Sequence, residues 1–267
     1  MVLALLVSLF AGLATSVGGL LVVGRRTVER SRLGVSLAFA AGAMLLISLM
    51  EVLPLGLTAL GQEYPPMPAA SLAYGAFFVG ILLVLGIDRF LPAELNPNET
   101  EGREAEMSAG EAHQVRYLMR SGLLVALVLS LHNLPEGMAT FFATYADPQV
   151  GITLAIAIAI HNVPEGIAVA APVYAATRSR AKALLWATAS GLTEPLGALL
   201  GLALVSFVVP QSLFGVIYGL VAGMMVFLAL DELLPGAWRY QTHAHQTVYG
   251  MLAGMVVVAL SLVLFAA

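Results

Sequence analysis

Long apolar segments recur along the whole chain and limit its fold more than any other feature. An α-helix rises about 1.5 Å per residue, so roughly twenty apolar residues cross the ~30 Å hydrocarbon core of a membrane. Eight such segments are present, at residues 2–23, 34–60, 70–91, 117–145, 151–176, 183–209, 213–234 and 248–267. A soluble fold could not bury the apolar surface of a chain with 60% hydrophobic residues and a mean hydropathy of +0.92. We therefore predict an all-α integral membrane protein, a single transmembrane domain of eight helices over residues 1–267.

The basic residues predict which side of the membrane each loop faces. All 12 Lys and Arg residues lie in or beside the first, third, fifth and seventh loops, and the other loops contain none. Short cytoplasmic loops collect Lys and Arg, so these four loops are predicted to be cytoplasmic and both chain termini to lie outside. The third loop, 92–116, is rich in glutamate and is predicted to be an acidic cytoplasmic linker.

Two internal repeats indicate an inverted architecture. The sequence H-N-L-P-E-G at 132–137 recurs as H-N-V-P-E-G at 161–166, and residues 41–54 resemble residues 222–235. A weaker similarity relates 12–21 to 191–200. In the last two comparisons the partners are five spans apart, so the two copies cross the membrane in opposite directions. A 3+2+3 inverted repeat of this kind is typical of secondary transporters that bind their substrate at mid-membrane.

Three glutamates lie well inside predicted spans and need a compensating charge. Glu136, Glu165 and Glu194 would each cost about 2.5–3.5 kcal/mol at the centre of a bilayer. The usual partner, a buried Lys or Arg, is not available because every basic residue is assigned to a loop. The positive charge is therefore predicted to come from protons or from a bound cation.

The neighbours of these glutamates favour a transition metal. In each copy of the repeat a histidine precedes the glutamate by four residues, so imidazole and carboxylate share one helix face, with an asparagine beside them. Zinc and ferrous iron favour such a mixture of nitrogen and oxygen ligands, whereas calcium or magnesium would favour oxygen alone. The chain has no cysteine, so any soft ligand must be His or Met. Protons remain as competitors or counter-ions.

The residues flanking each motif glutamate predict an irregular, closely packed region. Pro135 and Pro164 lack an N–H and leave helical carbonyls without partners, which is tolerated in a membrane only beside protein, water or an ion. Gly137 and Gly166 allow close approach of neighbouring helices.

With these motifs the sequence resembles the ZIP (Zrt-, Irt-like protein) transporter family, and most of all its bacterial branch of broad metal specificity, over nearly the whole chain. The resemblance implies two adjoining metal sites that share two bridging glutamates. The residues implied are His132, Glu136, His161 and Glu165 with Met44 as a soft ligand for the first site, and Asn133, Asn162 and Glu194 with the shared Glu136 and Glu165 for the second.

The resemblance also implies the activity and its setting. The expected function is uptake of Zn²⁺ and Fe²⁺, with Mn²⁺, Co²⁺ and Cd²⁺ as further ions, into the cytoplasm by alternating access. Spans one, four, five and six would slide against spans two, three, seven and eight, in a homodimer within the cytoplasmic membrane of a prokaryote. Metal ions and membrane lipids are the expected partners, with no resident cofactor and no nucleic acid.

Other polar residues and other functions remain open from the sequence. Glu51 is predicted to lie at the pathway mouth on the exported side, and the Asp231–Glu232 pair to anchor a helix at the interface. His243 and His245 either receive the exiting metal or form a solvated surface pair. A membrane-embedded dinuclear metalloenzyme is an alternative, although no general base is evident beyond the ligands. A metal-selective channel is another, and it would differ in lacking tight occlusion.

Overall fold

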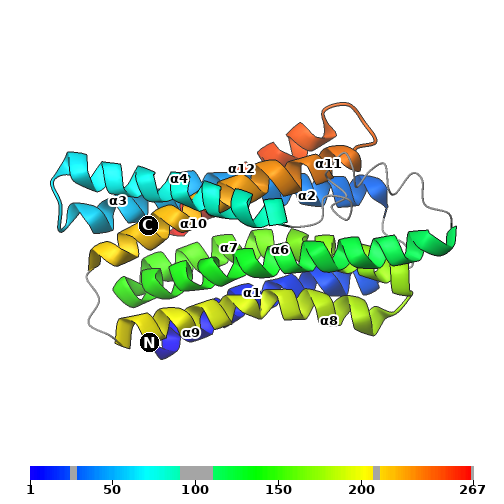
Figure 1. The fold of residues 1–267 in the computed structure, drawn as a ribbon, viewed down its shortest axis with the longest axis horizontal. Helices are drawn as coiled ribbons and strands as arrows, with labels where there is room; N and C mark the ends of the chain where they lie inside the picture. The colour runs from blue at the N-terminus through cyan, green and yellow to red at the C-terminus, as the bar shows by residue number, and fades with distance from the viewer. Residues whose placement is uncertain (25–28, 91–110, 207–210, 266–267) are drawn as a thin grey trace.

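The computed structural model describes residues 1–24, 29–90, 111–206 and 211–265, and all regular structure in these ranges is helical. The helices, in chain order, are α1 (Val2–Val23), α2 (Arg30–Ile47), η1 (Ser48–Val52), α3 (Leu53–Gly61), α4 (Pro66–Phe90), α6 (Glu111–Ala146), α7 (Pro148–Thr177), α8 (Arg180–Gly191), α9 (Thr193–Ser206), α10 (Gln211–Leu228), η3 (Ala229–Leu233), α11 (Leu234–Arg239) and α12 (Gln246–Phe265). The helices lie side by side in one elongated bundle, and α1 begins at the same end of the bundle at which α12 ends (Figure 1).

Seven helical stretches within the described residues are long and apolar enough to cross a membrane. They correspond to predicted spans one to three and five to eight, and they make this chain an all-helical integral membrane protein. The predicted fourth span falls on α6, where the side chains of residues 111–125 lie outside the described part of the structure. Residues 92–110 of the predicted acidic linker, 92–116, are also outside it. The count of eight spans therefore stays a prediction.

Three of the predicted spans are interrupted helices. Residues 34–60 contain a π-helical turn, η1, between α2 and α3, and residues 183–209 divide at Leu192 into α8 and α9. The seventh span contains a second π-helical turn, η3, and continues through α11 to Arg239, beyond the predicted end at residue 234. Each interruption is followed within three residues by a proline: Pro54, Pro195 or Pro235. Proline cannot donate to the carbonyl four residues earlier, so a regular α-helix cannot run through these points undisturbed.

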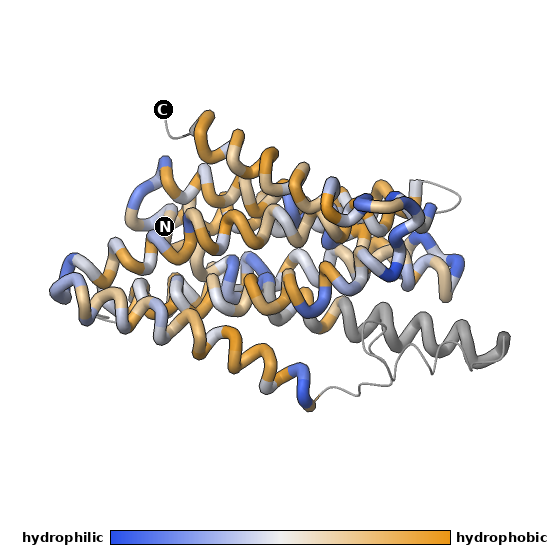
Figure 2. Tube along the Cα trace, turned by 90° about the horizontal axis from the view of Figure 1, so that it is seen from above, coloured by the Kyte–Doolittle hydropathy of each residue, from blue (hydrophilic) through white to orange (hydrophobic). Residues whose placement is uncertain are grey.

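The surface and the core differ in the size of their apolar side chains. Large apolar residues are exposed along α1, α4 and α12, for example Phe10, Phe78 and Leu260. Many core positions are alanines, such as Ala38 and Ala41 on α2, which are fully buried. In Figure 2 hydrophobic residues run along the helices, and many of the hydrophilic residues gather at the ends. This is the pattern of helices that pack through small residues and face lipid with large ones.

The helices pack in two groups. The first comprises α1, α6, α7, α8 and α9, and the second α2, α3, α4, α10, α11 and α12. Contacts of α7 with α2 and α12 join the groups. These groups contain the same spans that the family resemblance assigned to two relatively sliding blocks.

The two π-helical turns occupy equivalent positions in the longer repeat. Glu51 is the fourth residue of η1 and Glu232 the fourth residue of η3, and each turn is followed by a helix with proline at its second position. In Figure 1 the segment from α2 to α3 runs in the opposite direction to the segment from α10 to α11. The repeat that is visible in the sequence is therefore also a repeat of an unusual local structure.

Candidate metal centre

The motif side chains of α6 and α7 meet in the interior of the first helix group. Glu136, His161 and Glu165 are all completely buried. His161 Nε2 lies 3.2 Å from Glu136 Oε1 and 4.0 Å from Glu165 Oε1. One imidazole nitrogen thus faces carboxylates from both helices, as the shared helix face of His161 and Glu165 predicted.

These separations suit a bound ion. Nitrogen and oxygen ligands lie about 2.1 Å from Zn²⁺, so two ligand atoms of a tetrahedral site are about 3.4 Å apart. The distances from His161 Nε2 to the two carboxylates, 3.2 and 4.0 Å, lie on either side of that value. A cation between the three side chains would need only small movements of the ligands.

Glu194 enters the centre from the start of α9. It lies in the first turn of that helix, where the unpaired N–H groups and the helix dipole favour a negative charge. Asn162 Nδ2 donates to Glu194 Oε2 at 2.8 Å and to the Ala11 carbonyl of α1 at 3.0 Å. Asn162 and Glu194 are completely buried. Asn162 therefore joins α7 to both α1 and α9.

The break between α8 and α9 also orients Asn133. The carbonyl of Ser190, one residue before the end of α8, accepts from Thr193 Oγ1 at 2.6 Å and from Asn133 Nδ2 at 3.1 Å. Because the amide nitrogen of Asn133 donates to Ser190, its oxygen Oδ1 points away from that carbonyl. Asn133 Oδ1 is buried and has no hydrogen-bond partner among the described residues. The same holds for Asn162 Oδ1. Each motif asparagine thus anchors its amide nitrogen and keeps its oxygen available to a ligand.

Glycines bring the helix backbones close around this centre, as predicted. A methyl group on Gly137 would meet the carbonyl oxygen of Glu194, and one on Gly166 would meet the carbonyl oxygen of Thr15. Both obstacles are main-chain atoms that cannot move aside independently. The glycine of each motif therefore sets the distance between its helix and the neighbouring one.

Acidic side chains dominate the centre. Three completely buried carboxylates, from Glu136, Glu165 and Glu194, lie in one helix group, and none of the basic side chains whose burial the structure describes is buried. Three ionised carboxylates at the centre of a bilayer would cost about 8–10 kcal/mol of insertion free energy. A divalent cation would offset this unfavourable term directly.

The predicted first site also includes His132 and Met44. His132 lies in α6 one turn before Glu136, but its side chain is outside the described part of the structure. Met44 is completely buried on α2, a helix that packs against α7, and its carbonyl accepts from Ser48 Oγ at 2.6 Å.

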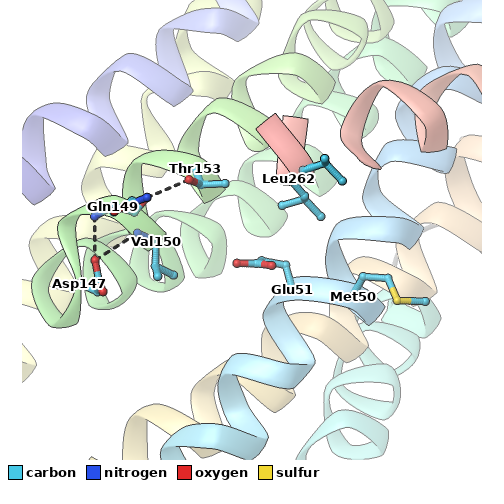
Figure 3. Close-up of a pocket in the computed structure, with 8 residues that line it drawn as sticks. Met50, Glu51, Asp147, Gln149, Val150, Thr153 and Leu262 are labelled. Carbon is cyan, nitrogen blue, oxygen red and sulfur yellow. Dashed lines mark hydrogen bonds between the residues drawn. The ribbon is translucent and has the colours of Figure 1, made fainter. Parts of the chain in front are cut away.

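Glu51 lines a cavity of about 460 Å³, which we call the Glu51 cavity. Its walls come from η1, the start of α7 and the end of α12 (Figure 3). The lining residues are Met50, Glu51, Asp147, Gln149, Val150, Thr153, Leu262 and Val263. Asp147 caps α7 by accepting from the backbone N–H groups of Gln149 and Val150, at 2.9 and 3.3 Å. Asp147 was not among the predicted site residues, although Asp-Pro at the start of an apolar segment is a helix-start signal that marks it.

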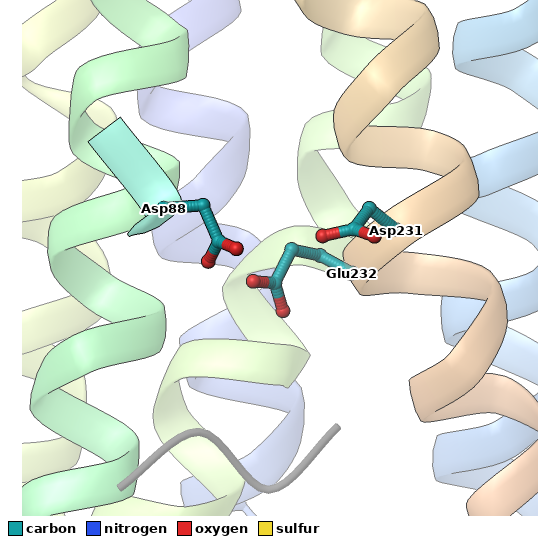
Figure 4. A group of neighbouring side chains, drawn as sticks. All are labelled: Asp88, Asp231 and Glu232. Carbon is teal, nitrogen blue, oxygen red and sulfur yellow. The ribbon is translucent and has the colours of Figure 1, made fainter. Parts of the chain in front are cut away.

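A second group of carboxylates lies between α4 and η3. Asp88, Asp231 and Glu232 are half-buried, and one oxygen from each lies within 4.8 Å of the others (Figure 4). Asp231 and Glu232 were expected to be interface anchors and were not connected with Asp88, because nothing local in the sequence pairs α4 with η3.

The two remaining candidates, His243 and His245, lie far along the chain from the buried centre, in the connection between α11 and α12. Both are exposed. His243 Nδ1 lies 2.9 Å from Thr242 Oγ1, and the ring of His245 lies beside that of Tyr249. The structure does not bring them to the buried site.

A membrane-embedded helical bundle with an acidic, histidine-containing centre is typical of the class of cation transporters. Comparison with known proteins defines the family within that class. The family model described as ZIP Zinc transporter matches residues 91–262. Proteins named zinc transporter ZupT are similar over nearly their whole length, including those of Corynebacterium glutamicum (47% identity; 97% of each chain) and Streptococcus mutans (42% identity; 98% of this chain and 97% of the relative). The ZupT protein of Stenotrophomonas maltophilia strain R551-3 is 46% identical over 98% of this chain and 96% of its own.

The chain therefore belongs to the ZIP zinc transporter family. Membership confirms the prediction of a divalent-metal transporter and excludes the metalloenzyme alternative. The bacterial relatives and the apolar helices together make this a multi-pass protein of a prokaryotic inner membrane.

Proposed function

We propose that this protein carries zinc, and related divalent transition-metal ions, from the outside into the cytoplasm through the buried centre between α6, α7 and α9. One observation carries the proposal: three completely buried carboxylates gather around an imidazole and an amide, while no basic side chain of described burial is buried with them. A cation is the component that this arrangement needs. The zinc named in the relatives' descriptions is the first candidate.

The ligands divide into two adjoining sites. In the first, Glu136, His161 and Glu165 bind the ion together with His132, the repeat counterpart of His161, and the thioether of Met44. In the second, the amide oxygens of Asn133 and Asn162 join Glu194, and Glu136 and Glu165 bridge the two sites. The His161–carboxylate distances of 3.2 and 4.0 Å support the first site, and the Asn162–Glu194 hydrogen bond of 2.8 Å supports the second.

Transport proceeds by alternating access of an eight-span 3+2+3 inverted repeat with both termini outside. The matching π-helical turns, with Glu51 and Glu232 at the same place, support the repeat. The two packed helix groups support a movement of α1 and α6–α9 against the remaining helices. In this orientation the Glu51 cavity is the external approach to the centre, and Asp88, Asp231 and Glu232 lie on the cytoplasmic half of the path.

The mixture of imidazole, carboxylate and amide ligands extends the proposal to Fe²⁺, Mn²⁺, Co²⁺ and Cd²⁺, because none of these ligand types is exclusive to zinc. Assembly as a homodimer in lipid remains a prediction from the family. His243 and His245 remain candidates to receive the released ion.

The test is Zn²⁺ uptake into proteoliposomes by the unmodified protein and by Glu165→Gln and His161→Ala. Loss of a direct ligand should lower kcat/KM by about 100-fold or more, since even the partners of ligands contribute 10- to 100-fold. Glu29→Gln is the matched control, because Glu29 is exposed and pairs only with Arg32 among the residues that the structure describes. Equal uptake by all four proteins would exclude the site. Saturable uptake with temperature dependence would separate a carrier from the channel alternative.

A further inference from the structure

The weak similarity between residues 12–21 and 191–200 corresponds to equivalent packing. A methyl group on Gly18 of α1 would meet the carbonyl oxygen of Val163, and one on Gly197 of α9 would meet the carbonyl oxygen of Leu134. Val163 and Leu134 are the same position of the two H-N-x-P-E-G motifs. Thus α1 lies on α7 as α9 lies on α6.

The two motif asparagines extend this equivalence. Asn162 donates to the carbonyl of Ala11 at 3.0 Å, and Asn133 donates to the carbonyl of Ser190 at 3.1 Å. The motif glycines also make equivalent contacts: Gly166 lies against the carbonyl of Thr15, and Gly137 lies against the carbonyl of Glu194. These matched contacts all relate α1 to α8–α9 by one constant shift in residue number, and that shift makes Thr15 the counterpart of Glu194.

Thr15 and Glu194 differ in how far they reach. Glu194 Oε2 accepts from Asn162 Nδ2 at 2.8 Å, whereas no hydrogen bond is found between Thr15 and Asn133 in the described chain. A glutamate oxygen is two bonds further from Cβ than a threonine hydroxyl, a difference close to the ~2.8 Å length of a hydroxyl–water hydrogen bond. One water molecule on Thr15 would therefore occupy the place that the Glu194 carboxylate occupies on the other side.

The polar atoms on the Thr15 side are buried and need a partner of this kind. Thr15 Oγ1, Ser190 Oγ and Asn133 Oδ1 have no hydrogen-bond partner among the described residues. Thr15 and Asn133 are completely buried, and Ser190 is 2% exposed. Thr15 Oγ1 lies against Gly191, the residue after Ser190. Buried polar groups are almost always hydrogen-bonded to protein, to ordered water or to an ion, so this side is suited to a bound water molecule.

We propose that Thr15 determines the strength of metal binding by holding a water ligand of the transported ion opposite Glu194. The inference rests on the proposed function and adds a residue from α1 to its second site. A neutral hydroxyl also keeps this half of the centre free of a fourth carboxylate. Of the two equivalent helices, α9 then contributes an anionic oxygen and α1 a neutral one, in addition to the bridging glutamates and the amides. The lower negative charge favours release of the ion.

Zn²⁺ affinity of the purified protein in detergent, measured by competition with a fluorescent zinc chelator, tests the inference. Thr15→Val is nearly isosteric but lacks the hydroxyl, and should weaken Zn²⁺ binding about 10-fold, the lower end of the effect of residues that hold metal ligands. Thr15→Ala should do the same, and Thr15→Ser should restore binding. Ser8→Ala is the control, because Ser8 is completely buried on the same helix and its hydroxyl also lacks a partner in the described chain.

Uptake should show a KM about 10-fold higher for Thr15→Val with a maximal rate changed less than about 2-fold. Unmodified affinity in either hydroxyl-free variant would overturn the inference, and so would equal weakening by Ser8→Ala. If Thr15 acted only in packing, its substitutions would change the unfolding temperature, and Thr15→Ser would not restore Zn²⁺ affinity. The proposed function fails on a different result, the absence of saturable uptake by the unmodified protein.

Discussion

Asn162 shows how much of the centre depends on one side chain. Its amide nitrogen donates to α1 at Ala11 and to α9 at Glu194, while its backbone belongs to α7. A buried amide that makes two hydrogen bonds has a fixed orientation, so its oxygen also points in a fixed direction. The centre is therefore organised before an ion arrives.

Glu51 is the residue whose charge can be tested apart from the buried ligands. Glu51→Gln should raise the KM for Zn²⁺ about 3- to 10-fold at low ionic strength, because an acidic cavity raises the local concentration of cations. The increase should shrink as salt is added, since the screening length falls from about 10 Å at 0.1 M to about 3 Å at 1 M. Initial uptake rates at several salt concentrations measure it.

Met50→Leu is the control for Glu51→Gln because it changes a neighbouring wall of the same cavity without changing charge. A salt-independent effect of Glu51→Gln, or an equal effect of Met50→Leu, would contradict electrostatic attraction.

Single residues of the centre were predictable where chemistry and spacing are local. His161 and Glu165 are four residues apart, so their shared face follows from helix geometry alone. The hydrogen-bond partners of Asn162 were not predictable, because they come from helices far away in the chain. The same is true of Asp88, which lies beside Asp231 and Glu232. Only the packing of whole helices brings such residues together.

At the scale of elements, main-chain contacts dominate the first helix group. Gly12 and Gly191 each lie against the other's carbonyl oxygen. Gly166 lies against the carbonyl oxygen of Thr15, and Gly137 against that of Glu194. With no side chain between two backbones, there is little that can relax. The helices around the centre therefore form a stiff unit.

Gly166→Ala tests that stiffness. The added methyl group would meet the Thr15 backbone, and overpacking of this kind destabilises by about 1–3 kcal/mol. The unfolding temperature in detergent should fall by several degrees, at ~2–4 °C per kcal/mol for a chain of this size.

Gly86→Ala is the matched control, because an added methyl group there meets nothing within 4 Å and alanine is the better helix former. Its unfolding temperature should stay the same or rise. If both variants unfolded alike, close approach at Gly166 would not matter.

The extents of the elements were predictable, but their interruptions were not. Predicted span 2–23 coincides with α1, because apolar length is a direct requirement of the membrane. The π-helical turns and the break at Leu192 lie inside long apolar segments. Acidic residues occur at each of these points, but an acidic residue does not indicate a change of helix type. Pro54, Pro195 and Pro235 were the available signs, and they mark where a helix is disturbed without saying how.

At the scale of the whole molecule, an ion at the centre should stabilise the fold. Its proposed carboxylate ligands come from α6, α7 and α9, so a bound ion would join three helices. A ligand that binds only the folded state adds about 2.7 kcal/mol at 100 times its Kd. Zn²⁺ at that concentration should raise the unfolding temperature by roughly 5–10 °C.

The same measurement on Glu165→Gln separates the centre from adventitious binding. The zinc-induced rise in unfolding temperature should largely disappear in Glu165→Gln. In the control variant Glu29→Gln it should be as large as in the unmodified protein. A full shift in Glu165→Gln would mean that zinc stabilises the protein from another place.

The π-helical turn η1 lets one membrane-crossing segment serve two environments. Met44 and Glu51 are seven residues apart, which in a continuous α-helix is about 700° and puts both on one face. The additional residue of a π-helical turn rotates the later part of the helix by up to about 100°. Met44 is thus completely buried, while Glu51, seven residues later, lines its cavity. A regular α-helix of unchanged length through 48–52 would instead align the thioether and the carboxylate, and the proposed step from capture to coordination would lose its change of direction.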